Sequence, residues 1–300
     1  MPELPDLESY LVALRKRLEG QTLEQVTVRS PFVLRTFDPP IESLIGLPLE
    51  RLTRLGKRIV WHFPHELFLV VHLMIAGRFH WKDRHVAAKG KNDLAAFRFA
   101  AGTLLLTEAS PKKRASLHVL QGWPAVQALH RGGIEPLACS LAEFCAVLRS
   151  ENHTLKRSLA DPRLFSGIGN AYSDEILHTA RLSPLQWTSR LSDEQIAVLF
   201  AAVQRVLAKW RDRLCAEAAQ RFPEKVTAFR PEMAVHGKFG QPCPACGHTV
   251  QRIVYAENEC NYCPTCQTDG RLLADRSLSR LLKDDWPRTI EEWEEQRGRS

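Results

Sequence analysis

The sequence predicts an α+β fold in which an N-terminal β-sandwich with a leading α-helix is followed by a helical domain and a cysteine-rich finger. Three observations predict it. Apolar residues recur at helical spacing up to residue 18, short β-rich runs fill residues 22–121, and helical spacing returns after Gly122. Two closely spaced cysteine pairs then follow between residues 243 and 266.

The leading helix is short and amphipathic. Pro5 suits the first turn of a helix, where its missing N–H would have no intrahelical acceptor, and Gly20 ends the pattern. The apolar residues between them lie three or four positions apart and are Leu7, Tyr10, Leu11, Leu14 and Leu18. We therefore expect one helix at the start of the chain.

The β-rich region contains several short runs separated by Gly, Pro and Asn-Asp turns. The clearest runs cover residues 25–29, 58–62, 67–78, 95–100 and 103–106. Short antiparallel strands of this kind form either a β-sandwich or a barrel. We expect a β-sandwich domain over residues 1–122.

The helical region is clearest where Ser192 and Gln195 form a capping box ahead of a long apolar stripe. A second domain is therefore expected over residues 123–230. The stretch 221–241, with its Pro, Gly and alternating charges, reads as a loop that leads into a finger at 231–268. The tail at 269–300 has no role that the sequence reveals.

Charge and composition limit the class of protein. The 300 residues are 44% hydrophobic, and 41 Lys and Arg against 34 Asp and Glu give a formal charge of +7. This balance makes a polyanionic partner plausible without establishing one. The N-terminus has no secretory pattern, and no apolar run approaches the roughly 18 residues of a membrane span. We expect a cytoplasmic monomer that does not contact a membrane.

The cysteines indicate a metal site. Cys243 and Cys246 form one C-x2-C pair, Cys263 and Cys266 form another, and sixteen residues separate the pairs. This spacing predicts one zinc ion bound by four thiolates, which is a closed, structural site. The residues between the pairs suggest a β-hairpin. Because zinc ribbons also occur in proteins that bind RNA or other proteins, the finger alone does not name a function.

The N-terminus offers a nucleophile. Removal of Met1 would expose the secondary amine of Pro2, which has an appreciable neutral fraction near pH 7. Attack on C1′ of a nucleotide would expel the base and give an iminium that cannot lose a proton. Glu3 could protonate the opening sugar, and Lys57, entering a predicted strand, could orient a phosphate. The plainer alternative is that Met-Pro starts are common and that a lysine at a strand edge only faces solvent.

Four separated motifs together resemble the formamidopyrimidine-DNA glycosylase/endonuclease VIII (Fpg/Nei) family. They are residues 1–5 with Glu8, residues 55–58, residues 167–172 with Glu175, and the cysteine finger. The resemblance runs from residue 1 to about residue 267. It implies a C-terminal domain with a helix-two-turn-helix and a zinc finger, and damaged double-stranded DNA as the partner.

The resemblance also implies roles for individual residues. Pro2 would be the nucleophile, Glu3 the general acid and Lys57 a catalytic auxiliary. The backbone of Gly167 and Gly169, the side chain of Asn170 and that of Lys156 would hold DNA phosphates at a helix N-terminus. A tight glycine turn between two helices, without any ligand, is the plainer alternative for this segment.

Several positions depart from the family pattern. Ile75 stands where the family has a methionine that fills the gap left by a flipped base. Lys113 replaces an arginine that contacts the opposite base, so selectivity for that base should be weaker. Arg114 replaces a wedge phenylalanine, and Asn258 replaces the arginine at the finger tip. These changes bear on the preferred lesion and not on the class of reaction.

The expected function is that of a bifunctional DNA glycosylase and AP lyase in base-excision repair. It would remove oxidised bases through a Schiff base on Pro2 and cut the strand by β elimination, with δ elimination left open. A non-catalytic or lyase-only relative that binds damaged DNA is the first alternative. A zinc-ribbon protein acting on RNA is the second, and it leaves the Pro2-Glu3 start unexplained.

Overall fold

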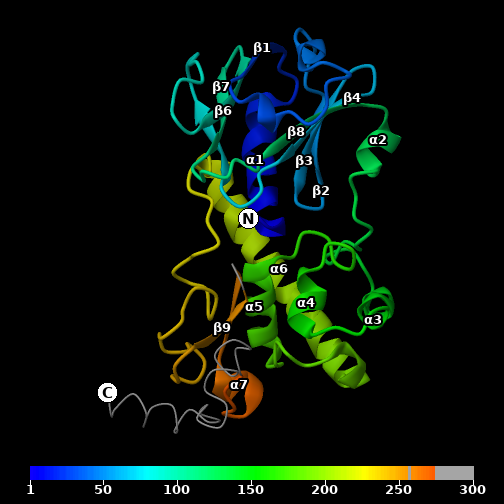
Figure 1. The fold of residues 1–300 in the computed structure, drawn as a ribbon, viewed down its shortest axis with the longest axis vertical. Helices are drawn as coiled ribbons and strands as arrows, with labels where there is room; N and C mark the ends of the chain where they lie inside the picture. The colour runs from blue at the N-terminus through cyan, green and yellow to red at the C-terminus, as the bar shows by residue number, and fades with distance from the viewer. Residues whose placement is uncertain (256–257, 274–300) are drawn as a thin grey trace. The chain divides into compact units, whose positions relative to one another are not determined.

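The structure, a computed structural model, describes residues 1–255 and 258–273. The chain divides into two compact units (Figure 1). The N-terminal unit consists of Met1–Gly133 and Ala208–Thr227. The C-terminal unit consists of Ile134–Leu207 and the described residues from Ala228 onward.

The N-terminal unit contains two four-stranded antiparallel sheets, which confirms the expected sandwich. One sheet has the order β1 (Leu23–Val28), β6 (Asp93–Phe99), β7 (Gly102–Glu108), β5 (Gly77–Lys82). The other has the order β2 (Arg51–Leu55), β3 (Arg58–Phe63), β4 (Leu67–His72), β8 (Ser116–Gln121). Two short 3-10 turns, η1 (Pro31–Val33) and η2 (Ile41–Leu44), lie between β1 and β2.

The core of this unit forms between the sheets. Trp61 of β3 contacts Phe97 and Phe99 of β6, with ring centroids 5.1 and 6.2 Å apart. The leading helix α1 (Leu4–Leu18) adds its apolar face to the same core, and Figure 1 shows it between the two sheets. Tyr10 of α1 meets Phe79 of β5 edge to face at 5.5 Å. Each such buried ring contributes about 1.5–3 kcal/mol relative to an exposed one.

The outer face of the second sheet carries a smaller apolar cluster. Val60, Phe68 and Val70 are covered there by Val126 of α2 (Trp123–Gln127). At the rim of this face His62 is 4% exposed and stacks on Trp123, and its Nε2 lies 2.7 Å from the Thr53 hydroxyl. This histidine is therefore part of the packed sheet.

The buried His62 makes stability sensitive to acid. Burial and the neighbouring Arg51 lower the pKa of His62 from 6.5 to about 4. Between these values the unfolded chain binds a proton that the folded protein does not, so stability falls as the pH drops from about 6.5 toward about 4. We expect a loss of roughly 2 kcal/mol between pH 7 and pH 5 from this group. Urea unfolding of His62→Gln at both pH values should show a smaller loss, and an unchanged loss would contradict the assignment.

The C-terminal unit is helical and ends in a hairpin finger. Its elements are α3 (Leu141–Arg149), α4 (Leu155–Ala160), α5 (Asn170–Ala180), η3 (Thr188–Arg190), the first part of α6 (Asp193–Gln220), β9 (Gln251–Tyr255), β10 (Asn258–Tyr262) and α7 (Pro264–Thr268). Phe144 packs against Phe165 and Phe200, with centroids 4.8 and 5.4 Å apart. The predicted capping box is confirmed, because Ser192 and Gln195 each accept the other's backbone N–H at 3.2 Å.

Some predicted elements have different limits. The run at 67–78 is split by a turn, in which Met74 adopts a left-handed backbone with φ of 51°. The helix α4 ends at Ala160, because Pro162 cannot continue it. The helix α6 was expected to lie in one domain, and its second half from Ala208 belongs to the N-terminal unit.

Among the described residues, no helix combines the length and the apolar character that crossing a membrane requires.

Candidate functional site

The chain is buried in the N-terminal unit from Pro2 onward, whereas Met1 is exposed. Pro2 is buried, Glu3 is 3% exposed and Asp6 is 1% exposed. The Glu3 backbone N–H donates to Asp6 Oδ2 at 3.0 Å, at the point where α1 begins. Asp6 thus satisfies an amide that the helix itself leaves without an acceptor. This bond fixes the chain directly after Pro2.

Charged groups surround the α-amino group, which in this structure belongs to Met1. Its pKa is lowered from 8.0, first because burial disfavours the charged form. Glu3 and Asp6 act in the opposite sense, whereas Arg78 and Lys57 lower the pKa further. The structure therefore brings two of the predicted residues, Glu3 and Lys57, within electrostatic reach of the N-terminus. Such an environment favours the neutral amine that a nucleophile requires.

Lys57 lies in a tight turn and not inside a strand. It follows Gly56, whose φ of 60° allows β2 to turn directly into β3. The expectation that Lys57 enters a strand is off by one residue, since β3 begins at Arg58. Lys57 is partly buried, and its charge acts on the α-amino group of Met1.

Arg78 is a member of this region that the sequence analysis did not single out. Its guanidinium donates to three carbonyls, those of Val226 at 2.6 Å, Ile75 at 3.1 Å and Gly77 at 2.6 Å. It therefore holds the turn before β5 and the segment after α6 together. The available signal was a basic residue directly after Gly77 at the start of a strand.

Ile75 lies in the turn between β4 and β5. Its side chain is 56% exposed, which is unusual for a large aliphatic residue beside a packed sheet. The preceding left-handed Met74 and the bond from Arg78 fix the backbone of this turn. The geometry suits an apolar wedge, and that role stays a prediction.

The loop between β7 and β8 is organised by one buried acid. The carboxylate of Glu108, 1% exposed, accepts the backbone N–H groups of Arg114 at 2.8 Å and Ala115 at 3.0 Å. The Lys113 ammonium turns back and donates to the Glu108 carbonyl, whereas Arg114 is exposed. Of the two predicted DNA contacts in this loop, only Arg114 extends into solvent.

In the C-terminal unit, the glycine turn leads into α5 as expected. Gly167 is buried with φ of 80°, and Gly169 caps the helix that Asn170 begins. The Asn170 side chain donates to the Glu259 carbonyl of β10 at 2.8 Å. The turn therefore places Asn170 and the N-terminus of α5 beside the finger hairpin.

Lys156 has internal partners. Its ammonium donates to the Asn170 carbonyl at 2.6 Å and to the Ser173 hydroxyl at 2.8 Å, and it pairs with Asp174 at 2.5 Å. Asp174, itself fully buried, also accepts His236 Nδ1 at 2.8 Å. Lys156 thus joins α4 to α5. A phosphate contact by this lysine stays a prediction, and it would have to displace one of these acceptors.

Glu175 holds the loop that precedes the finger. Its carboxylate accepts three successive backbone N–H groups, from Ala234 at 2.8 Å and from Val235 and His236 at 2.9 Å. Hydrogen bonds of this kind to a charged acceptor are among the stronger ones in proteins. The sequence signal that could have predicted this contact is the pair of adjacent acids, Asp174 and Glu175, in the otherwise uncharged segment of α5.

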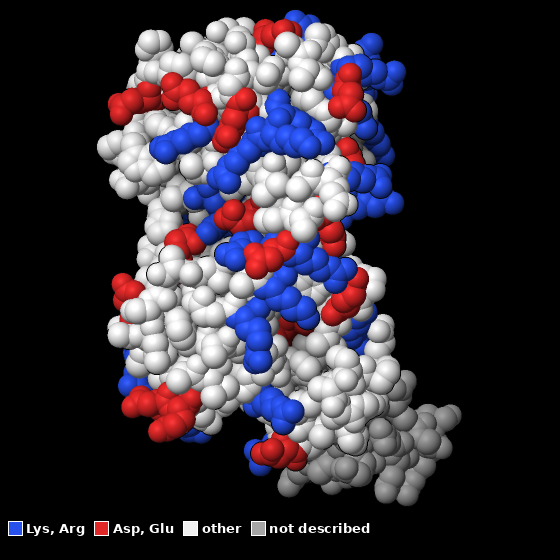
Figure 2. Space-filling view, turned by 180° about the vertical axis from the view of Figure 1, so that it is seen from behind, with Lys and Arg blue, Asp and Glu red and all other residues white. Residues whose placement is uncertain are grey.

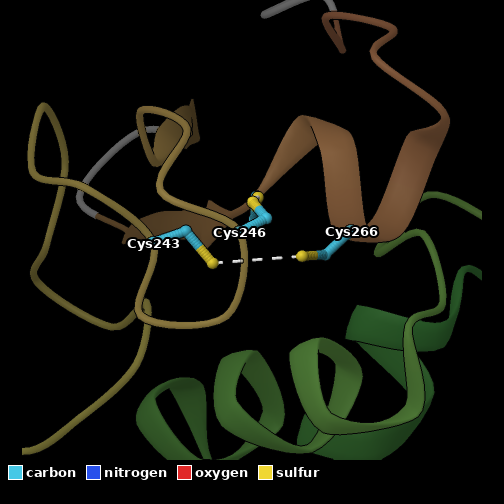
Figure 3. Close-up of side chains that lie close together, drawn as sticks. Cys243, Cys246 and Cys266 are labelled. Atoms are coloured by element: carbon cyan, nitrogen blue, oxygen red, sulfur yellow. Dashed lines mark hydrogen bonds between the residues drawn. The ribbon is translucent and has the colours of Figure 1, made fainter.

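The four predicted cysteines converge. Their Sγ atoms all lie within 4.8 Å of one another, with 4.0 Å between Cys243 and Cys266 and 3.4 Å between Cys246 and Cys263. A tetrahedral zinc–thiolate site with bonds of about 2.3 Å requires sulfur atoms roughly 3.8 Å apart. Figure 3 shows Cys243 and Cys266 facing each other, the first from the loop before β9 and the second from α7. The arrangement fits one structural zinc ion.

A buried histidine supports this site. His178 of α5 is 8% exposed, and its Nε2 lies 3.2 Å from Cys243 Sγ. An N–H directed at a ligating sulfur is a common means of orienting a metal ligand. The sequence analysis did not identify it, because His178 lies far from the finger in sequence.

The last predicted site residue is Asn258, which begins β10. Its side chain lies outside the described part of the structure, as does most of the tail at 269–300.

On the N-terminal unit, Figure 2 shows lysine and arginine side chains gathered in a broad patch, with acidic side chains toward its margin.

The fold and the cysteine cluster define a class: a protein with an N-terminal β-sandwich, a helical domain and a four-cysteine zinc finger. Family models of the formamidopyrimidine-DNA glycosylase N-terminal domain and of its H2TH domain match residues 1–113 and 133–210. A zinc finger found in Fpg and IleRS matches residues 240–268. The chain belongs to the formamidopyrimidine-DNA glycosylase family, which confirms the resemblance.

Individual members of the family are similar to this chain in sequence and in structure. The formamidopyrimidine-DNA glycosylase of Thermus thermophilus is 33% identical over 278 residues, which is 90% of this chain and all of that protein. An uncharacterised Fpg-like protein of Mycobacterium tuberculosis is 39% identical over 165 residues, covering 55% of this chain. The crystal structure of Lactococcus lactis Fpg bound to AP-site DNA superposes with a TM-score of 0.77 at 26% identity, covering 89% of this chain and 99% of that one.

Proposed function

We propose that this protein is a bifunctional DNA glycosylase and AP lyase that acts on oxidised bases in double-stranded DNA. The observation that carries the proposal is the burial of Pro2 and Glu3 at the start of α1, next to the amino group of Met1 on which Asp6, Lys57 and Arg78 also act. Membership of the family and the DNA-bound relatives support the substrate class.

The chemistry follows from the secondary amine of Pro2 once Met1 is removed. Its lone pair attacks C1′ while the C1′–N bond to the base breaks, and the departing base takes up the proton that the amine loses. The C1′–O4′ bond then breaks, Glu3 gives a proton to O4′, and the nitrogen lone pair forms the C1′=N bond. The resulting iminium carries a fixed positive charge, because a secondary amine leaves no N–H to lose. That charge acidifies C2′, so loss of a C2′ proton expels the 3′ phosphate in a β elimination. Lys57 orients the phosphate as a point charge.

The remaining predicted residues would bind the duplex. Amides at the N-terminus of α5, after Gly167 and Gly169, and the side chain of Asn170 suit a backbone phosphate. Ile75, exposed on its turn, would fill the space left by an extruded base. The role proposed for the zinc finger is to support Asn170 through the contact with β10.

Borohydride trapping tests the proposal. We expect protein that has lost Met1 and holds zinc to form a covalent adduct with duplexes containing an abasic site, 8-oxoguanine or an oxidised pyrimidine. Peptide mapping should locate the adduct on Pro2, and adduct yields should rank the lesions. Absence of an adduct with every duplex would overturn the enzymatic assignment.

A lyase-only or non-catalytic protein that binds damaged DNA is the second candidate. The observation that favours it is the inward orientation of Lys113, together with arginine in place of a wedge phenylalanine at position 114. An adduct with the abasic duplex but with neither damaged base would identify a lyase-only protein. Tight binding without any adduct would identify a non-catalytic one.

A further inference from the structure

The turn between β4 and β5 is closed by its own backbone. The Gly77 N–H donates to the Leu73 carbonyl at 2.8 Å, and Met74 adopts a left-handed backbone with φ of 51°. A Cβ atom on residue 77 would lie 2.2 Å from the Leu73 carbonyl oxygen, so only glycine allows this close approach. Ile75, in the middle of the turn, is exposed. The shape of the turn is therefore fixed by residues 73–77 themselves.

The side chain of Arg78 connects this turn to the rest of the N-terminal unit. Its Nη1 donates to the carbonyls of Ile75 at 3.1 Å and Gly77 at 2.6 Å. Its Nε donates to the Val226 carbonyl at 2.6 Å. A guanidinium carries its donors in a rigid planar fork, whereas an ammonium is a point charge on a flexible stem. The shape of the arginine side chain, and not only its charge, therefore joins the two segments.

Val226 is itself fixed in the core. Its side chain is 4% exposed and belongs to the main apolar cluster of the unit. Two residues earlier, the Glu224 carboxylate contacts His80 Nδ1 and accepts the Trp81 backbone N–H at 3.3 Å. The segment after α6 is thus fastened along β5. A hydrogen bond to the Val226 carbonyl therefore ties the Ile75 turn to a part of the unit that does not move easily.

A residue that fills the space of an extruded base works against a restoring force, because unstacking and unpairing a base costs free energy. The Ile75 side chain is 56% exposed, so neighbouring side chains give it little support. A turn held only by its own backbone would move as a unit when the base returns. The support for Ile75 must therefore come through its backbone, which is where Arg78 holds it.

We propose that Arg78 is a positioning residue for base extrusion, which holds the turn carrying Ile75 against the segment at Val226 so that Ile75 can replace the extruded base. This inference rests on the proposed function, because it uses the wedge role proposed above for Ile75. An abasic site has no base to extrude. Arg78 should therefore matter more for damaged bases than for abasic sites.

Arg78 also acts on the α-amino group through its charge. The charged groups that surround this amine are Glu3 and Asp6 of α1, Lys57 of the turn between β2 and β3, and Arg78 of β5. Glu224 is the further charged group near this end of β5. Arg78 lowers the pKa of the amine, so loss of its charge should raise that pKa. The acid limb of the pH–rate profile for abasic cleavage would then move to higher pH.

Two variants separate the charge from the hydrogen-bonding fork. Arg78→Lys keeps the charge and loses the fork, whereas Arg78→Gln loses both. In single turnovers, Arg78→Lys should lower excision of 8-oxoguanine or an oxidised pyrimidine at least about tenfold more than it lowers cleavage of an abasic duplex. The acid limb should stay at the wild-type pH in Arg78→Lys and move to higher pH in Arg78→Gln. Arg213, exposed on α6, provides the matched control, and Arg213→Lys should keep wild-type rates on both duplexes.

A double-mutant cycle tests whether Arg78 acts through Ile75. Ile75→Ala should show the same selective loss on damaged bases. Arg78→Lys combined with Ile75→Ala should be little worse than Ile75→Ala alone, because support for a side chain that is absent has no effect. An arginine that is merely structural would give losses that multiply, and equal losses on both kinds of duplex. Either of these results would overturn the inference.

The wild-type protein distinguishes this inference from the proposed function. If wild type excises damaged bases and Arg78→Lys does so at the same rate, the proposed function stands and the inference fails. If wild type cleaves only the abasic duplex, or forms no borohydride adduct with any duplex, the proposed function fails and the inference fails with it. The same cycle run with Arg78→Gln, at a pH above both acid limbs, ensures that the result does not depend on the folding of one variant.

Discussion

Replacement of Pro2 by glycine is expected to lower both adduct formation and strand cleavage at an abasic site by at least about 100-fold, or roughly 2.7 kcal/mol of activation free energy. Glycine at this position presents a primary amine, whose imine can lose its proton and with it the positive charge that drives elimination. The measurement is single-turnover cleavage of an end-labelled abasic duplex, with parallel borohydride trapping.

Binding provides the control for this variant. The contacts proposed to DNA lie in other elements, so Pro2→Gly should bind the abasic-analogue duplex with nearly wild-type affinity. Its α1 should also remain folded, because the bond between Glu3 and Asp6 does not involve residue 2. Wild-type adduct yield from Pro2→Gly would contradict the assignment and would direct attention to Lys57 as the nucleophile.

Loss of zinc is expected to unfold the finger and to reduce affinity for DNA by at least about tenfold. The apolar cluster around the site is small, with Val235 and Val250 beside Cys243 and Cys263, so the metal must supply much of the stability of this segment. Cys246→Ser removes one of four ligands from a closed shell. Zinc content, circular dichroism melting and fluorescence anisotropy would measure the three consequences.

A cysteine outside the cluster is the matched control. Cys145 of α3 is partly exposed and takes no part in the metal site, so Cys145→Ser should keep one zinc per chain and wild-type affinity. Asn170, at the start of α5, contacts the backbone of β10. The Cys246→Ser variant should therefore lose affinity for DNA both because the hairpin is disturbed and because Asn170 loses its support. Wild-type melting and affinity in a zinc-free Cys246→Ser protein would contradict a structural role for the metal.

Local features of the fold could be predicted because their signals are local. Short β-rich runs predicted the strands, and the Ser192 capping box predicted the start of α6. The cysteine spacing predicted the zinc site. Positions of turns were harder. The run at 67–78 looks continuous in sequence, and only the left-handed backbone at Met74 reveals that it is two strands.

Partners of charged side chains could not be predicted, because they depend on residues far away in sequence. Lys156 was expected to hold a DNA phosphate, and the sequence gives no sign that its ammonium pairs with Asp174, eighteen residues further along. Lys113 was expected to contact DNA, a role that stays a prediction, and its hydrogen bond to the Glu108 carbonyl could not be foreseen from the sequence. Arg78 was passed over, since nothing near it in the sequence indicates the carbonyl of Val226.

The way in which Glu175 holds the loop has a consequence for how this family can vary. The carboxylate contacts only the backbone of residues 234–236, so these positions are free to change side chain without loss of the bonds. Position 175 has no such freedom, because glutamine would direct an NH2 group at a backbone N–H and aspartate would be too short. Comparison of relatives should therefore find a tolerant loop paired with an invariant acid. An alignment scored for variability at the loop alone would overlook the constraint that shapes it.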